Sequence, residues 1–99
     1  MNVEAKIETL RQIGAEAVVD QTLNKIIRSE LYQLTQVQEN LRQELAAFEQ
    51  RYCMSSEECW NGFEAGELGD DADYFEWTGL YEIYQSNEAT LQRLKASLG

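Results

Sequence analysis

The sequence predicts an all-α fold, in which a long antiparallel helical hairpin with a short elbow helix is completed by oligomerisation. The chain has no proline in 99 residues and is rich in Glu, Gln, Leu, Ala and Arg, which favour helix. Two long stretches carry apolar residues every three or four positions, the spacing of one helix face. A short capped segment between them supplies enough chain to reverse direction. We expect one helical domain over residues 1–99.

The first expected helix is short and covers residues 3–13. Apolar residues recur within it every three or four positions, and Gly14 then interrupts the pattern. This pattern fits either a separate helix or the frayed start of the next one.

The second expected helix, residues 17–52, has the strongest periodicity. In one heptad register the d positions are all large and apolar: Ile27, Leu34, Leu41 and Phe48. The a positions of that register are Leu31, Gln38, Leu45 and Tyr52. Gln38 is the polar interruption in this stripe. A helix of about 36 residues spans roughly 54 Å, and it needs a partner helix from this chain, from another chain, or from both.

The elbow helix is expected over residues 56–65. Ser55 and Glu58 form the S-x-x-E capping box, which marks a helix start. Gly66 suits the position that ends a helix, because glycine adopts the left-handed conformation without steric cost.

The last expected helix covers residues 72–98, and Asp70 or Asp71 can cap its start. Its apolar face is formed by Trp77, Leu80, Tyr84, Asn87, Leu91, Leu94 and Leu98. Asn87 is the one strongly polar residue on that face. The two long helices therefore carry matching stripes, each with an internal polar position that would set the register of an assembly.

Charge is distributed unevenly along the chain. The whole chain has 18 acidic and 8 basic residues, for a net charge of −10. Residues 1–51 hold 8 acids and 6 bases, whereas residues 52–99 hold 10 acids and 2 bases. This balance argues against binding nucleic acid by the chain alone and against an anionic membrane, since both need basic contacts. It favours a basic protein partner.

Composition also argues against an enzyme or a metal protein. The chain has no histidine, so it lacks a histidine base, nucleophile partner or metal ligand. The acidic residues do not match a calcium-loop pattern, and no phosphate-binding glycine loop is present. We expect no cofactor, no metal and no catalytic residue.

Cys53 and Cys59 are six residues apart, a spacing that matches no common zinc motif. They fit small apolar residues at a structural turn, and a redox or metal pair is the alternative. Because no signal peptide or membrane-length apolar run is visible, we expect a soluble protein in a reducing cytoplasm.

Acidic and aromatic side chains are concentrated around the second turn. The acids fit helix capping and solvation, or alternatively a docking surface for basic side chains. The aromatic residues are Tyr74, Phe75, Trp77, Tyr81 and Tyr84. They fit core packing, or alternatively an interface that receives arginine through salt bridges and cation–π contacts.

The stretch from Glu49 to Trp77 resembles a group of small bacterial and archaeal proteins with the core E-x-x-Y-G-M-S-S-E-E-F…F-E-x-G-E-L-G-D-D-x-D-F-F-E-W. Those proteins are helical, and some are encoded beside candidate toxins, so the resemblance implies an antitoxin-like role. This chain departs from the pattern at Cys53, where the group has glycine, and at Cys59, where it has phenylalanine. A glycine after the long helix would suit a left-handed position, so Cys53 is expected to strain that turn.

These observations predict a non-enzymatic, acidic protein–protein interaction module, antitoxin-like toward a basic toxin. The expected partner-binding residues are Glu64, Glu67, Asp70, Asp71, Asp73, Glu76 and Trp77. The alternative is a structural homo-oligomer, in which the stripes containing Gln38 and Asn87 pair between chains.

Overall fold

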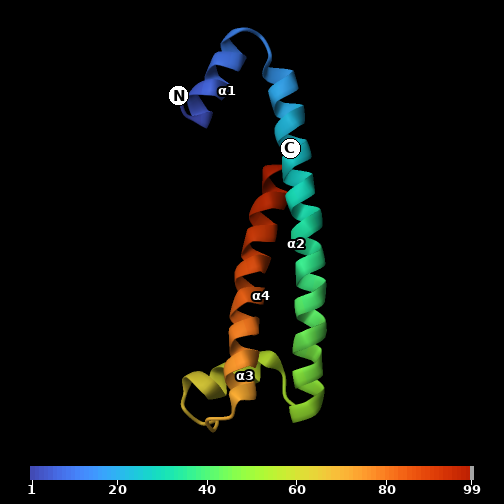
Figure 1. Cartoon of the computed structure of the whole chain (residues 1–99), viewed down its shortest axis with the longest axis vertical. Coiled ribbons are helices and arrows are strands. Elements are labelled where there is room, and N and C mark those ends of the chain that lie inside the picture. The colour runs from blue at the N-terminus through green and yellow to red at the C-terminus, as the bar shows by residue number, and fades with distance from the viewer. Residues whose placement is uncertain (99) are drawn as a thin grey trace.

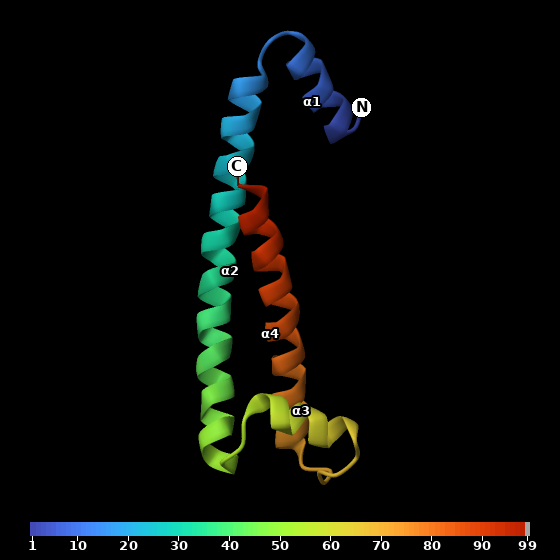
Figure 2. The same cartoon turned by 180° about the vertical axis from the view of Figure 1, so that it is seen from behind.

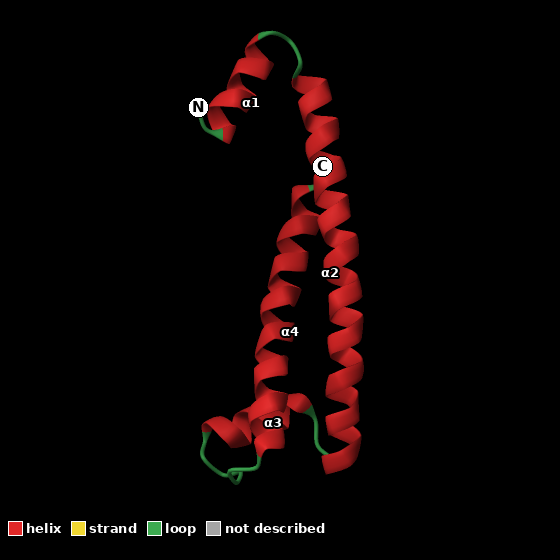
Figure 3. Ribbon diagram, in the orientation of Figure 1, coloured by secondary structure: helices red, strands yellow, loops and turns green. Residues whose placement is uncertain are grey.

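A computed structural model describes residues 1–98 of this chain as four helices joined by short loops. They are α1 (Val3–Gln12), α2 (Glu16–Tyr52), α3 (Ser56–Glu64) and α4 (Ala72–Ser97). No strand occurs in this part of the chain (Figure 3). The prediction of an all-α fold is confirmed, and each helix begins and ends within one residue of the expected position.

The two long helices, α2 and α4, run antiparallel and pack side by side (Figures 1 and 2). The short helix α3 lies across the end of the pair where the chain reverses, as expected for an elbow. The molecule is a rod with extents of 62 × 23 × 18 Å. Because α2 is longer than α4, its first turns continue past the end of α4 and face no helix except α1 (Figure 1).

The hydrophobic core lies at the elbow end of the rod, where α2, α3 and α4 meet. Its buried residues are Leu45, Phe48, Cys59 and Trp77. Partly buried side chains surround them: Tyr52, Met54, Leu68, Tyr74, Leu80, Tyr81 and Tyr84. Three of the five clustered aromatic residues therefore pack around the core and Trp77 lies within it, whereas Phe75 remains 61% exposed. Core packing is the main role of this aromatic cluster.

The polar position of α2 is used within the chain. Gln38 is buried, and its Nε2 donates hydrogen bonds to the backbone oxygen of Tyr84 at 3.0 Å and to Glu88 Oε1 at 2.9 Å. The α2 stripe that contains Gln38 therefore packs against α4 within one chain, and the pairing of the Gln38 and Asn87 stripes between chains stays a prediction.

Helix α1 is separate from α2, which resolves the ambiguity around Gly14. Gly14 has φ +87°, a left-handed conformation that breaks the helix and turns the chain. The amide of Ala15 then donates to the backbone oxygen of Leu10 at 2.9 Å, which closes a Schellman-type helix end. The Asn2 side chain caps the start of α1 by accepting the amide of Ala5 at 2.7 Å. Helix α1 thus folds back beside the free end of α2.

The turn between α2 and α3 contains a strained residue. Cys53 follows the last residue of α2 and has φ 53° and ψ 46°, the left-handed region that favours glycine. Ser55 then caps α3, since its Oγ accepts the amide of Glu58 at 3.0 Å as the capping pattern predicts. At the other end of α3, Gly66 has φ +72°, which confirms its expected role as the helix stop.

The substitution Cys53→Gly should raise the free energy of unfolding by about 1 kcal/mol, because glycine adopts the left-handed conformation without the steric penalty. For a chain of this size, that gain corresponds to a rise of about 4–8 °C in Tm, which thermal melting followed by circular dichroism would detect. Cys53→Ala is the matched control, since it removes the thiol and keeps the strain. Equal Tm values for the glycine and alanine variants would show that backbone strain at this turn is unimportant.

Candidate partner-binding surface

The residues predicted to bind a partner lie at the elbow end of the molecule, but the structure divides them into separate groups. They come from the end of α3, from the loop of residues 65–71 and from the first turns of α4. Their surroundings show which of them hold the fold together and which are free to meet another molecule.

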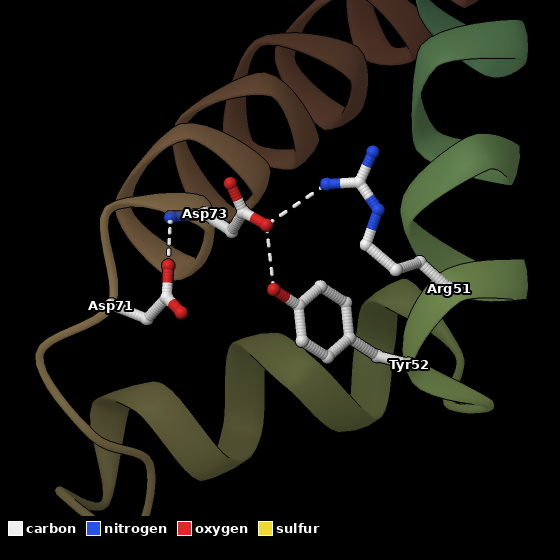
Figure 4. Close-up of polar contacts among 4 residues, drawn as sticks. All are labelled: Arg51, Tyr52, Asp71 and Asp73. Atoms are coloured by element: carbon white, nitrogen blue, oxygen red, sulfur yellow. Dashed lines mark hydrogen bonds and ion pairs between the residues drawn. The ribbon is translucent and has the colours of Figure 1, made fainter.

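Asp73 is engaged in a contact that fastens α4 to the end of α2 (Figure 4). Its Oδ2 accepts hydrogen bonds from the Tyr52 hydroxyl at 2.5 Å and from Arg51 Nη1 at 2.9 Å. The same guanidinium lies 5.6 Å from the ring centroid of Phe48 and covers the core. Asp73 is therefore a structural residue first, and its carboxylate is already paired with a base of this chain.

This contact shifts the pKa values of both Asp73 and Tyr52. The Tyr52 hydrogen bond, helped by Arg51, lowers the pKa of Asp73 below its ordinary value, so the carboxylate stays charged. The hydrogen bond to Asp73 raises the pKa of Tyr52 to about 12, so the phenol stays protonated. Near neutral pH, Asp73 is therefore charged and Tyr52 is protonated, which are the states that this hydrogen bond requires.

Asp71 has a local role at the start of α4. Its Oδ1 accepts the amide of Asp73 at 2.9 Å, which satisfies a free backbone donor of the first helical turn (Figure 4). The expectation that Asp70 or Asp71 caps this helix is confirmed for Asp71.

The prediction that Trp77 belongs to the partner-binding surface is wrong. Its side chain is 0% exposed, so it cannot contact a partner. The indole ring stacks on Phe48 with centroids 5.5 Å apart, and Nε1 donates to Ser56 Oγ at 2.8 Å. Ser56 in turn donates from its hydroxyl and its backbone amide to Glu49 Oε2, each at 2.9 Å. Trp77 therefore belongs to a core network that joins three helices.

Apart from Asp71, which caps α4, four of the predicted residues are exposed on the surface. They are Glu64, Glu67, Asp70 and Glu76. They lie on a part of the chain, residues 56–82, that has nine acidic residues and no lysine or arginine. We call residues 56–82 the acidic end, and these four carboxylates are its free charges near the α3–α4 loop.

A shallow groove beside α3 and α4 was not predicted from the sequence. It measures about 360 Å³ and is lined by Glu57, Trp60, Asn61, Tyr81, Glu82 and Gln85. The rings of Trp60 and Tyr81 lie 6.3 Å apart at 49°, and the Tyr81 hydroxyl accepts a hydrogen bond from Gln85 Nε2 at 2.6 Å. We call it the Trp60 groove. The clustering of aromatic residues gave a signal for it, but residues 60 and 81 become neighbours only when α3 folds against α4.

The two cysteines are free and lie in different surroundings. Cys59 is fully buried in the core, and burial raises the pKa of its thiol, whereas Cys53 is exposed in the turn. Across residues 1–98, no three histidine, cysteine, aspartate or glutamate side chains gather in a way that could hold a metal ion. Within the same range, no helix is both long and apolar enough to cross a membrane.

No known family model, curated protein or solved structure matches this chain. Functional inference therefore rests on the contacts, exposure and charge of its own residues.

Proposed function

We propose that this chain is a non-enzymatic interaction module whose acidic end binds a basic protein partner. The observation that carries the proposal is the Trp60 groove, because the aromatic rings of Trp60 and Tyr81 line the same groove as the carboxylates of Glu57 and Glu82. Aromatic faces and carboxylates together attract an arginine or lysine side chain, through cation–π contacts and ion pairs.

The charge around the groove supports the same partner. The acidic end has no base of its own, and Arg51 on α2 already pairs with Asp73. The free carboxylates near the loop would raise the rate of encounter with a basic surface, while the groove would supply the specific contact. An antitoxin-like role toward a basic toxin is the particular form of this function that the sequence resemblance implies.

The test reverses the charge of two exposed carboxylates in the groove. Asp71 and Asp73 are unsuitable, because one caps α4 and the other holds α4 to α2. Glu57→Lys with Glu82→Lys alters only exposed groove carboxylates and should weaken partner binding by at least about tenfold, since each lost charge pair at an interface costs more than about 1.4 kcal/mol.

Glu4→Lys with Glu44→Lys is the matched control, because it makes the same change in net charge at two exposed residues outside the acidic end. The tagged chain and both variants would be purified from native cells at low salt, with mass spectrometry of the bound proteins. We expect one stoichiometric basic protein with the wild type and the control, released as salt rises. Equal recovery of that protein by the groove variant, or no stoichiometric partner, would contradict the proposal.

A further inference from the structure

The N-terminal part of the molecule is helical without having a core. We call residues 1–28, which comprise α1 and the free end of α2, the N-terminal arm. None of these residues is buried, since the buried residues of α2 begin at Gln38. An isolated helix as short as the 10-residue α1 is only marginally stable in water. The arm therefore lacks the packing that normally holds such helices in place.

Large apolar side chains are concentrated on this arm. Seven of the eleven exposed large hydrophobic residues belong to it: Met1, Val3, Leu10, Ile13, Val18, Leu23 and Ile26. The exposed fraction is 90% at Met1, 73% at Ile13 and 69% at Val3. Clustered exposure of this kind marks an interaction surface, whereas single exposed apolar residues are ordinary.

The arm is also shaped to receive a helix. Helices α1 and α2 form an open V (Figure 2). The groove between them measures about 250 Å³. Its lining is Val3, Ile7, Leu10, Val18, Val19, Thr22 and Leu23. The one polar group, the Thr22 hydroxyl, donates to the backbone oxygen of Val18 at 2.8 Å. The groove thus has no free polar side chain for a small polar ligand and fits an apolar helix face.

The charge of the arm does not oppose pairing with a second copy. Residues 1–28 hold four acids (Glu4, Glu8, Glu16 and Asp20) and four bases (Lys6, Arg11, Lys25 and Arg28), so the arm has no net charge. The whole net charge of −10 therefore lies in residues 29–99. Two copies that meet through their arms face no net repulsion there. A basic partner, in contrast, is attracted to the opposite end of the rod.

We propose that the N-terminal arm is a homodimerisation surface, and that the same arm of a second copy fills its apolar groove. Two V-shaped helix pairs related by a two-fold axis form a four-helix bundle, the usual way for such pairs to bury their apolar faces. The acidic ends, at the far ends of two rods each 62 Å long, are then held apart, and each remains open to a partner. This inference is independent of the proposed function.

The test measures mass in solution for the full chain, by sedimentation equilibrium over a range of concentrations. We expect the wild type to have twice its chain mass of 11.4 kDa. Val18→Glu with Ile26→Glu places charges in the bundle and should weaken dimerisation by at least about 100-fold. Because these side chains are 65% and 55% exposed in one copy, the core at the elbow is unaffected.

The matched control is Phe75→Glu with Ile83→Glu, since those side chains are similarly exposed, at 61% and 51%, but lie at the acidic end. This control should remain a dimer. The wild-type dimer should also persist near 1 M salt, where contacts between exposed charges are screened. In the arm variant, circular dichroism should show the loss of arm helices only, because they lose their packing.

Several outcomes would overturn the inference. A monomeric wild type at every concentration would mean that the second copy is not the occupant of the groove. A mass other than twice the chain mass would refute the two-fold bundle. A dimer that the arm variant keeps and the control loses would place the contact at the acidic end.

Discussion

Replacing Trp77 by alanine should lower the free energy of unfolding by about 3–5 kcal/mol, the cost typical of removing a large buried aromatic side chain. Trp77 is fully buried, and its indole stacks on Phe48 and on Tyr52, with centroids 5.5 and 5.7 Å apart. Alanine leaves a cavity between three helices and removes the indole N–H that donates to Ser56 Oγ, which still donates to Glu49. Because small domains are stable by only about 5–15 kcal/mol, this change removes a large share of the total.

Urea denaturation followed by circular dichroism would measure the effect. Trp77→Phe is the informative control, because it keeps an aromatic ring against Phe48 and removes only the hydrogen bond to Ser56 and part of the volume. The free energy of unfolding should fall much less in Trp77→Phe than in Trp77→Ala. If Trp77→Ala cost less than about 1 kcal/mol, the core assigned to the elbow would be wrong.

Replacing Glu49 by alanine should cost about 2–3 kcal/mol, the range expected when a charged acceptor of two hydrogen bonds is lost. Glu49 Oε2 accepts both the backbone amide and the hydroxyl of Ser56, the first residue of α3. Its negative charge also lies at the positive N-terminal end of α3. Without Glu49, the buried Ser56 has no acceptor for its hydroxyl proton, although its oxygen still accepts the indole N–H of Trp77.

Glu49→Gln separates the hydrogen bonds from the charge, since an amide oxygen still accepts from Ser56. The free energy of unfolding should fall less than half as much in Glu49→Gln as in Glu49→Ala, measured by the same urea titration. Equal losses for glutamine and alanine would mean that charge at the start of α3 matters more than the hydrogen bonds.

The two substitutions act on one network, so their effects should not be additive. Trp77 and Glu49 contact the same Ser56 hydroxyl from opposite sides, one as donor and one as acceptor. The double variant should therefore be less destabilised than the sum of the single variants. This network also holds α3 against α4, and the Trp60 groove exists only while they are held together.

Local sequence determined the helices. The helix signals are local: they are the absence of proline, the periodic apolar residues and the caps at Ser55 and Asp71. Each depends only on residues a few positions apart, so it can be recognised without knowledge of the fold. The left-handed turn at Cys53 was implied only by the resemblance, because the similar proteins have glycine at this position.

The roles of the acidic and aromatic residues were predicted less well. Trp77 was assigned to the partner surface because it follows a run of acids, yet it lies at the centre of the core. Asp73 looked like one acid among many until Arg51 and Tyr52, about twenty residues earlier, were brought beside it. Both of these roles depend on contacts between residues far apart in the sequence.

The sequence by itself determined that this protein is a helical hairpin with an acidic half, because helix periodicity, capping and net charge are local or summed properties of the chain. Only the tertiary structure decided which residues are free to bind. Packing of α3 against α2 and α4 buries Trp77 and forms the Trp60 groove, and packing of α2 against α4 pairs Asp73 with Arg51 and Tyr52. The greater length of α2 than α4 leaves the N-terminal arm uncovered, since the apolar face of a helix is buried only where a second helix reaches it.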